Sequence, residues 1–231
     1  MQHRAGLIVA LDTADAAEAN AWARELAPYA AAFKLGLEFF AANGPQAVAR
    51  FGRKVFLDLK FHDIPTTVAK AVRAVLPLRP KMLSLHAAGG RAMIEAARLA
   101  VEAYGEERPL LLAVTVLTSL SPAGLAEIGI PDGPEQQVLR LARLALSAGA
   151  DGLICSPQEV ALLRAEFGAG PVLVVPGIRP GGSQLMDQAR TLSPRAAAAA
   201  GADFLVVGRP ITLAENPVAA AKHILAEMAA A

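Results

Sequence analysis

The sequence predicts a single (β/α)8 barrel, the TIM-barrel architecture of α/β proteins, extending over residues 1–231. Short apolar runs alternate with longer alanine- and leucine-rich segments of helical spacing, which is typical of parallel strands joined by helical crossovers. Eight such pairs follow one another with no domain boundary between them. Polar residues also recur at the carboxyl ends of the apolar runs, where barrels build their active sites. A doubly wound open sheet is the alternative, because a count of units does not prove closure.

Eight apolar runs have the length and the bounding turn residues of buried strands, and the second run is the weakest of them. The predicted strands are residues 6–11, 31–34, 55–60, 82–86, 110–115, 152–155, 172–175 and 204–207.

Helical spacing fills the segments between the strands. The predicted helices are residues 14–27, 38–51, 67–76, 91–104, 134–148, 157–167, 194–200 and 218–228. Proline near a helix start and glycine just past a helix end mark several of these boundaries. The prolines are Pro134, Pro157 and Pro194, and the glycines are Gly149, Gly168 and Gly201.

Composition excludes several classes of protein. With 54% hydrophobic residues the chain is typical of a folded globular protein, and its net charge of +1 without a basic stripe argues against nucleic-acid binding. The longest apolar stretch near the N-terminus, residues 6–11, is far shorter than the roughly 18 residues of a membrane span, and no signal peptide precedes it. We therefore expect no membrane association and a cytoplasmic protein. Cys155 is the only cysteine, which excludes an intrachain disulfide and a cysteine-based metal cluster.

One stretch places three alternating charges at the end of the third predicted strand. Since side chains alternate along a strand, Asp58 and Lys60 share a face, and Asp63 follows just beyond the strand. Pro65 then begins a predicted helix. A structural ion pair is the simpler interpretation, but charges flanked by apolar residues are costly to bury unless they are paired or used. The stretch therefore indicates a functional site.

Other polar residues fall at the ends of other predicted strands, and in a barrel these ends meet on one face. They are Asp12, Lys34, His86, Thr115, Thr118, Arg179 and Arg209. A role in a turn or a helix cap would explain any one of them, but it does not explain their recurrence over so many strands.

Two glycine-containing stretches near the C-terminus predict a phosphate site. Residues 176–182 follow the seventh strand and contain Arg179, and residues 208–210 follow the eighth and contain Gly208 and Arg209. Barrels commonly bind phosphate at this place, where glycine admits the ligand to backbone N–H groups and arginine donates paired hydrogen bonds. The connection from Gly181 through Gln188 is long enough to form a mobile lid.

The run Asp58-Leu59-Lys60-Phe61-His62-Asp63-Ile64-Pro65-Thr66-Thr67-Val68 resembles the signature of the bacterial orotidine 5′-phosphate decarboxylases. Further segments that resemble this family occur in its order over nearly the whole chain. They are Leu11-Asp12, Lys34-Leu35-Gly36, His86-Ala87-Ala88-Gly89-Gly90, Val116-Leu117-Thr118-Ser119, Pro176-Gly177-Ile178-Arg179-Pro180 and Val207-Gly208-Arg209-Pro210-Ile211-Thr212. Val175 stands where the family usually has threonine, a change that we do not expect to affect the chemistry.

The resemblance implies a decarboxylase without cofactor or metal that converts orotidine 5′-monophosphate to uridine 5′-monophosphate, the last step of de novo pyrimidine synthesis. By this analogy Lys60 protonates C6 as carbon dioxide leaves, and Asp58 lies beside the substrate carboxylate. Lys34 completes the array of charges with Asp63.

The resemblance also implies a homodimer in which the partner subunit supplies Asp63, Ile64 and Thr67 to the site. The remaining implied contacts are with the rest of the nucleotide. They are Asp12 on a ribose hydroxyl, Thr118 or Ser119 at the pyrimidine, and Arg179, Gln188, Gly208 and Arg209 around the phosphate.

Two alternatives remain open at this point. A magnesium-dependent sugar-phosphate decarboxylase or aldolase would resemble this chain, but its metal site would need an additional acidic ligand where Lys34 stands. A nucleotide-binding barrel without catalysis is possible because fold alone does not determine function. Such a protein would not require the set of Lys34, Asp58, Lys60 and Asp63.

Overall fold

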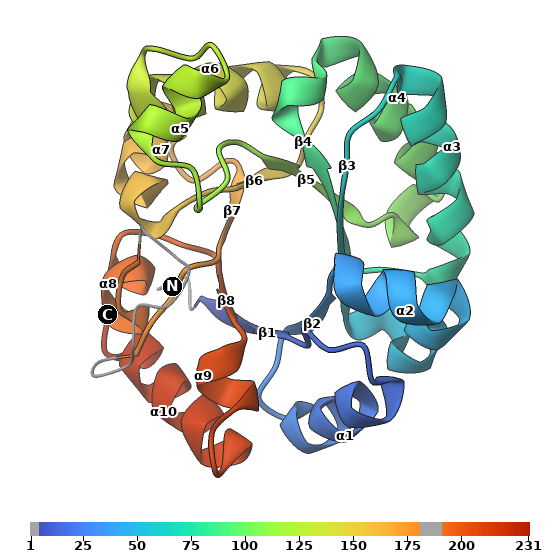
Figure 1. Ribbon diagram of the computed structural model, residues 1–231, viewed down its shortest axis with the longest axis vertical. Coiled ribbons are helices and arrows are strands. Elements are labelled where there is room, and N and C mark those ends of the chain that lie inside the picture. The colour runs from blue at the N-terminus through green and yellow to red at the C-terminus, as the bar shows by residue number, and fades with distance from the viewer. Residues whose placement is uncertain (1–4, 181–190) are drawn as a thin grey trace.

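The computed structural model describes residues 5–180 and 191–231. Eight parallel strands close into a barrel in the order of the chain (Figure 1). They are β1 (Gly6–Ala10), β2 (Ala32–Leu35), β3 (Val55–Phe61), β4 (Met82–His86), β5 (Leu110–Val114), β6 (Gly152–Ile154), β7 (Val172–Val175) and β8 (Phe204–Val207). Because β1 pairs with β8, the barrel is confirmed and the open sheet is excluded. All eight predicted strands are present, with ends that differ by at most one residue from the prediction.

Helices surround the barrel (Figure 1). The α-helices are α1 (Ala16–Leu26), α2 (Leu37–Val48), α3 (Pro65–Val75), α4 (Arg91–Glu102), α5 (Pro122–Glu127), α6 (Gly133–Ser147), α7 (Val160–Phe167), α8 (Pro194–Ala199), α9 (Arg209–Thr212) and α10 (Pro217–Ala229). The short helices α5 and α9 were not predicted, because four or six residues do not establish a helical period. The predicted second helix is interrupted at Gly44, whose φ of 69° is not helical, and it continues as a 3-10 turn over Ala49–Lys54.

Two layers of apolar side chains form the core. A smaller cluster fills the inside of the barrel and includes Ile8, Phe56 and Leu112. A larger one lies between the outer faces of the strands and the surrounding helices. Because both faces of each strand are buried, the strands appear in the sequence as continuous apolar runs rather than as alternating ones.

An irregularity in β3 interrupts its pairing with β4. Leu57 pairs with Leu83 and Phe61 pairs with Leu85, so four steps along β3 match only two along β4. The extra residues include Lys60, whose φ of 49° lies in the left-handed region. The prediction of a regular strand through Lys60 was therefore wrong in this detail.

Two aspartates at the amino-terminal end of the barrel make the same set of backbone contacts. Asp151 precedes β6, donates its N–H to the carbonyl of Leu111 on β5 at 2.9 Å, and accepts the Leu111 N–H on Oδ2 at 2.8 Å. Asp203 precedes β8 and makes the equivalent pair with Leu173 on β7, at 3.0 and 2.6 Å. Each aspartate thus joins two neighbouring strands where they begin.

Arginines from the outer layer complete both contacts. Arg98 and Arg108 bind the Asp151 carboxylate at 2.8 and 2.7 Å, and Arg164 binds that of Asp203 at 2.6 Å. Each aspartate is the last residue of a Gly-Ala-Asp sequence whose glycine has a positive φ, 97° at Gly149 and 103° at Gly201. We call the two sets the Asp151 clasp and the Asp203 clasp. They lie at the end of the barrel that usually serves stability rather than catalysis.

Within the described part of the chain, no helix has both the length and the apolar character needed to cross a membrane.

Candidate active site

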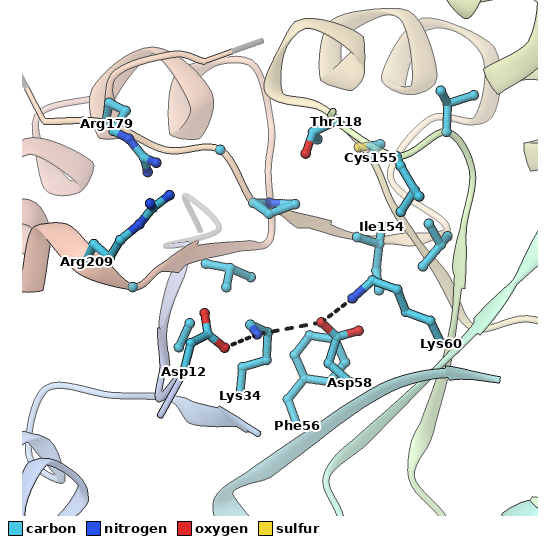
Figure 2. Close-up of a pocket in the computed structure, with 18 residues that line it drawn as sticks. Asp12, Lys34, Phe56, Asp58, Lys60, Thr118, Ile154, Cys155, Arg179 and Arg209 are labelled. Carbon is cyan, nitrogen blue, oxygen red and sulfur yellow. Dashed lines mark hydrogen bonds and ion pairs between the residues drawn. The ribbon is translucent and has the colours of Figure 1, made fainter. Parts of the chain in front are cut away.

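A cavity opens at the carboxyl-terminal ends of the strands and brings together side chains from nearly the whole chain (Figure 2). Eight of the predicted site residues line it: Asp12, Lys34, Asp58, Lys60, Thr118, Arg179, Gly208 and Arg209. The remaining wall is mainly apolar, with side chains that include Phe56, Ile154 and Cys155. The cavity therefore combines a charged part with an apolar part.

The charged part is a chain of ion pairs in which acidic and basic groups alternate. Lys34 Nζ lies 2.8 Å from Asp12 Oδ1 and 3.7 Å from Asp58 Oδ2, and Lys60 Nζ lies 2.8 Å from the same Asp58 oxygen. Figure 2 shows these four side chains in a row across the floor of the cavity. The prediction that Asp58 and Lys60 lie side by side is confirmed, although a bulge rather than regular strand alternation places the lysine.

Burial and charge act in opposite directions on the central pair. Burial by itself would raise the pKa of Asp58, but the charges of Lys34 and Lys60, with hydrogen bonds from Lys60 and Ser84, lower it below the ordinary value. Burial would likewise lower the pKa of Lys34, but the carboxylates of Asp58 and Asp12 raise it above the ordinary value. Both groups are therefore held in their charged forms.

The backbone at Lys60 is strained. A left-handed φ in a residue other than glycine costs roughly 1–2 kcal/mol, and such residues concentrate at functional sites. The conformation directs the Lys60 side chain into the cavity beside Asp58. Strain at this position is one reason to assign the lysine a function beyond stability.

Two histidines lie next to the charged part of the cavity. The rings of His62 and His86 are 5.2 Å apart between centroids and tilted by 36°. Burial, followed by the nearby His62 and Lys60, lowers the pKa of His86, and Asp58 opposes this only in part. His86 therefore favours its neutral form, which makes it unsuited to donate a proton near neutral pH.

Two arginines mark the opposite side of the cavity. Arg179 follows β7 and Arg209 begins α9, and Figure 2 shows both guanidinium groups turned toward the same space. Arginine is the side chain best suited to paired hydrogen bonds with phosphate oxygens. The geometry thus suits an anionic group held away from the Lys60 end of the site.

Several predicted residues do not line the cavity of this chain. Asp63, Ile64 and Thr67 lie on the exposed loop and first turn after β3, and the Asp63 carboxylate accepts the N–H of Ile64 at 2.6 Å. Ser119 is also exposed and outside the cavity wall, whereas its neighbour Thr118 lines it. Gln188 and the predicted lid lie outside the described residues.

Ser84 is a site residue that the sequence analysis missed. This buried serine on β4 donates a hydrogen bond to Asp58 Oδ1 at 2.8 Å and accepts one from the Lys60 N–H at 2.9 Å. The only signal in the sequence is a single hydroxyl residue between two leucines of an apolar strand.

A magnesium site would need several oxygen ligands at one place. Within residues 5–180 and 191–231, no three histidine, cysteine, aspartate or glutamate side chains are grouped so as to hold one. The place beside Asp58 where a magnesium site would need another acidic ligand is occupied by the ammonium group of Lys34.

Comparison with known proteins gives one consistent result. Residues 5–224 match the family model described as "Orotidine 5'-phosphate decarboxylase / HUMPS family". A protein of Gluconobacter oxydans named orotidine 5′-phosphate decarboxylase is 53% identical over 100% of both chains. One of the same name from Halorhodospira halophila is 54% identical over 97% of this chain and 96% of its own. The crystal structure of orotidine 5′-phosphate decarboxylase from Lactobacillus acidophilus has a TM-score of 0.84 and 38% identity, over 97% of this chain and 99% of that one.

Proposed function

The chain belongs to the orotidine 5′-phosphate decarboxylase / HUMPS family, and from this premise we infer how its cavity performs the family's reaction. The protein converts orotidine 5′-monophosphate to uridine 5′-monophosphate and carbon dioxide, in uridine monophosphate biosynthesis. The observation that supports a mechanism best is the row of Asp12, Lys34, Asp58 and Lys60 at the floor of the cavity.

Lys60 is the proton donor in this proposal. When the bond between C6 and the carboxylate breaks, its electron pair stays on C6 in the plane of the ring, where ring resonance cannot absorb it. A fixed ammonium group at about 4 Å would stabilise this charge by about 4 kcal/mol at an effective dielectric constant near 20. A proton then moves from Lys60 Nζ to C6, and solvent returns a proton to the lysine.

Asp58 and Lys34 prepare the site for this step. Asp58 holds the Lys60 ammonium group at 2.8 Å, and its own negative charge disfavours a second carboxylate nearby, so it favours loss of the substrate carboxylate as neutral carbon dioxide. Lys34 pairs with both Asp58 and Asp12, which keeps the buried carboxylate of Asp58 compensated.

The rest of the nucleotide would extend from this centre toward the arginines. We assign the ribose contact to Asp12, whose carboxylate is half exposed beside Lys34 and can accept a hydrogen bond from a ribose hydroxyl. Thr118 is the better candidate for the pyrimidine contact, because it lines the cavity and Ser119 does not. We assign the phosphate to Arg179, Gly208 and Arg209 in the cavity wall, together with Gln188 from the sequence.

A homodimer that completes each site with Asp63, Ile64 and Thr67 of the neighbouring subunit is part of the proposal. These residues are exposed on the single chain, and Ile64 leaves 64% of its surface in contact with solvent, which is unusual for isoleucine. We further propose that residues 1–231 form one catalytic domain that acts in the cytoplasm without a metal or cofactor.

The test is the ultraviolet absorbance of orotidine 5′-monophosphate after addition of the purified protein in excess chelator. We expect conversion to the uridine nucleotide at the same rate with and without chelator. Conversion that stops in chelator and returns with magnesium would contradict a metal-free mechanism. Turnover of a sugar phosphate, but not of orotidine 5′-monophosphate, would support the magnesium-dependent alternative.

A further inference from the structure

We propose that Ser84 is a positioning residue for the reaction, because its buried hydroxyl group holds both the Asp58 carboxylate and the backbone that carries Lys60. The inference rests on the proposed roles of Asp58 and Lys60. It adds a group that touches neither substrate nor product but determines where the two reacting charges lie.

The first observation is the pairing of β3 with β4. Between the pairs Leu57 with Leu83 and Phe61 with Leu85, three residues of β3 lie opposite Ser84 alone. The N–H of Lys60 donates instead to the Ser84 hydroxyl at 2.9 Å. The serine side chain thus satisfies a partly buried backbone donor at the one residue of β3 with a left-handed φ.

The second observation concerns the Asp58 carboxylate. A serine hydroxyl has one proton, and here it is donated to Asp58 Oδ1 at 2.8 Å. Oδ2 is then the oxygen that faces Lys60 at 2.8 Å and Lys34 at 3.7 Å. The hydrogen bond therefore fixes the rotation of the carboxylate and, through it, the place of the Lys60 ammonium group.

Both partners of the hydrogen bond between Ser84 and Asp58 are buried. Ser84 is 0% exposed and Asp58 is 6% exposed, so water cannot easily replace the hydroxyl. A hydrogen bond to an ionised carboxylate in such surroundings is stronger than one between neutral groups. Ser84 is in register with the buried Leu112 of the neighbouring strand β5. Packing alone would favour an apolar side chain at position 84 as well.

Loss of the hydroxyl is expected to act on turnover rather than on substrate binding. The charged and titratable groups around Asp58 are Lys34, Lys60 and the His86 and His62 pair, with Asp12 behind Lys34. None of these is replaced in a Ser84 variant. Arg179 and Arg209, which we assign to the phosphate, are also retained in these variants.

The experiment compares Ser84→Ala, Ser84→Thr and Ser84→Val in steady-state decarboxylation of orotidine 5′-monophosphate. Thr and Val have nearly the same shape, so their difference isolates the hydroxyl even if the added methyl group disturbs the core. We expect Ser84→Ala to lower kcat about 10- to 100-fold, the scale of one hydrogen bond to a charged group, with KM within about threefold of wild type. Ser84→Thr should exceed Ser84→Val in kcat by about tenfold.

Two results would overturn the proposal. One is a Ser84→Ala enzyme with wild-type kcat, and the other is equal loss in the Thr and Val variants. Thermal unfolding of each variant identifies the case in which Ser84→Ala fails to fold, and the Thr and Val comparison then decides. Absence of turnover by the wild-type protein would instead contradict the proposed function, so the two failures are distinguishable.

Discussion

Asp58 accepts a 2.8 Å hydrogen bond from the ammonium group of Lys60, two residues further along the same strand. In a regular strand these two side chains would lie on the same face, and here they remain in contact although the strand is bulged and Lys60 has a left-handed φ. The pair joins the proton donor of the proposed mechanism to the carboxylate that holds it in place.

Replacement of Lys60 tests its role most directly. We expect Lys60→Ala to lower turnover by about 10⁴-fold or more, because both the proton donor and the fixed cation are lost. Binding of uridine 5′-monophosphate, measured by calorimetry, should remain, since the proposed phosphate contacts lie elsewhere in the cavity. Lys222→Ala on the outer helix α10 is a matched control and should leave turnover unchanged. Near-normal turnover by Lys60→Ala would remove the lysine from its role.

Arg209 is expected to contribute through the phosphate. We expect Arg209→Ala to lower kcat/KM about 10- to 100-fold on the nucleotide, the scale of a charged hydrogen bond. The same variant should match wild type on orotidine, which has no phosphate for the arginine to bind. Arg195→Ala on α8 removes an exposed arginine and serves as the control. An equal loss on both substrates would show that Arg209 acts on the cavity as a whole.

A site shared between subunits predicts complementation. Lys60→Ala and Asp63→Ala should each be inactive alone, and an equal mixture should recover about a quarter of wild-type activity, because half of the dimers are hybrids with one intact site. Subunit exchange is checked by native mass spectrometry of the mixture. Hybrids that form but show no activity would contradict the shared site.

The Asp151 clasp predicts a pH-dependent contribution to stability. Burial would raise the pKa of Asp151, but hydrogen bonds from Arg108, Leu111 and Arg98 lower it below the ordinary value. A carboxyl group with a lowered pKa in the folded state stabilises the protein above the pKa of the unfolded chain. This contribution is lost as the pH falls through the folded-state pKa.

We therefore expect Asp151→Asn to lower the free energy of unfolding by about 1–3 kcal/mol at pH 7. The difference from wild type in the free energy of unfolding should become smaller in acid, at pH values below the ordinary pKa range of carboxyl groups. Urea unfolding over a series of pH values measures both. Glu166→Gln, in an exposed pair with Arg143, is the control and should change the free energy by less than about 1 kcal/mol. A difference that is independent of pH would assign the effect to shape rather than charge.

Much of this protein is predictable from its sequence. The strands are apolar runs bounded by turn residues, and the polar residues that follow them meet at one end once the barrel closes. The bulge at Lys60 was not predictable, because a left-handed lysine arises from pairing with β4 and not from the local sequence. Ser84 was missed for a similar reason, since its partners are 26 and 24 residues away in the chain.

The partners of the two clasp aspartates could not be predicted from the sequence either. Their Gly-Ala-Asp sequences recur before β6 and β8, but the arginines that complete them come from α4, α7 and the loop before β5. Sequence spacing cannot identify partners so far apart. Asp63, Ile64 and Thr67 present a further case, because their proposed partner is a second copy of the chain rather than any element of this one.

The two clasps lie at one rim of the barrel and the reactive charges at the other, about 16 Å apart along a strand of five residues such as β5. Substitutions at such separated positions usually add independently. The loss of catalytic activity on heating would then depend on contacts at the amino-terminal rim, although the reaction itself takes place at the carboxyl-terminal rim. An engineer could strengthen the clasps to prolong the working life of the catalyst while leaving its turnover untouched.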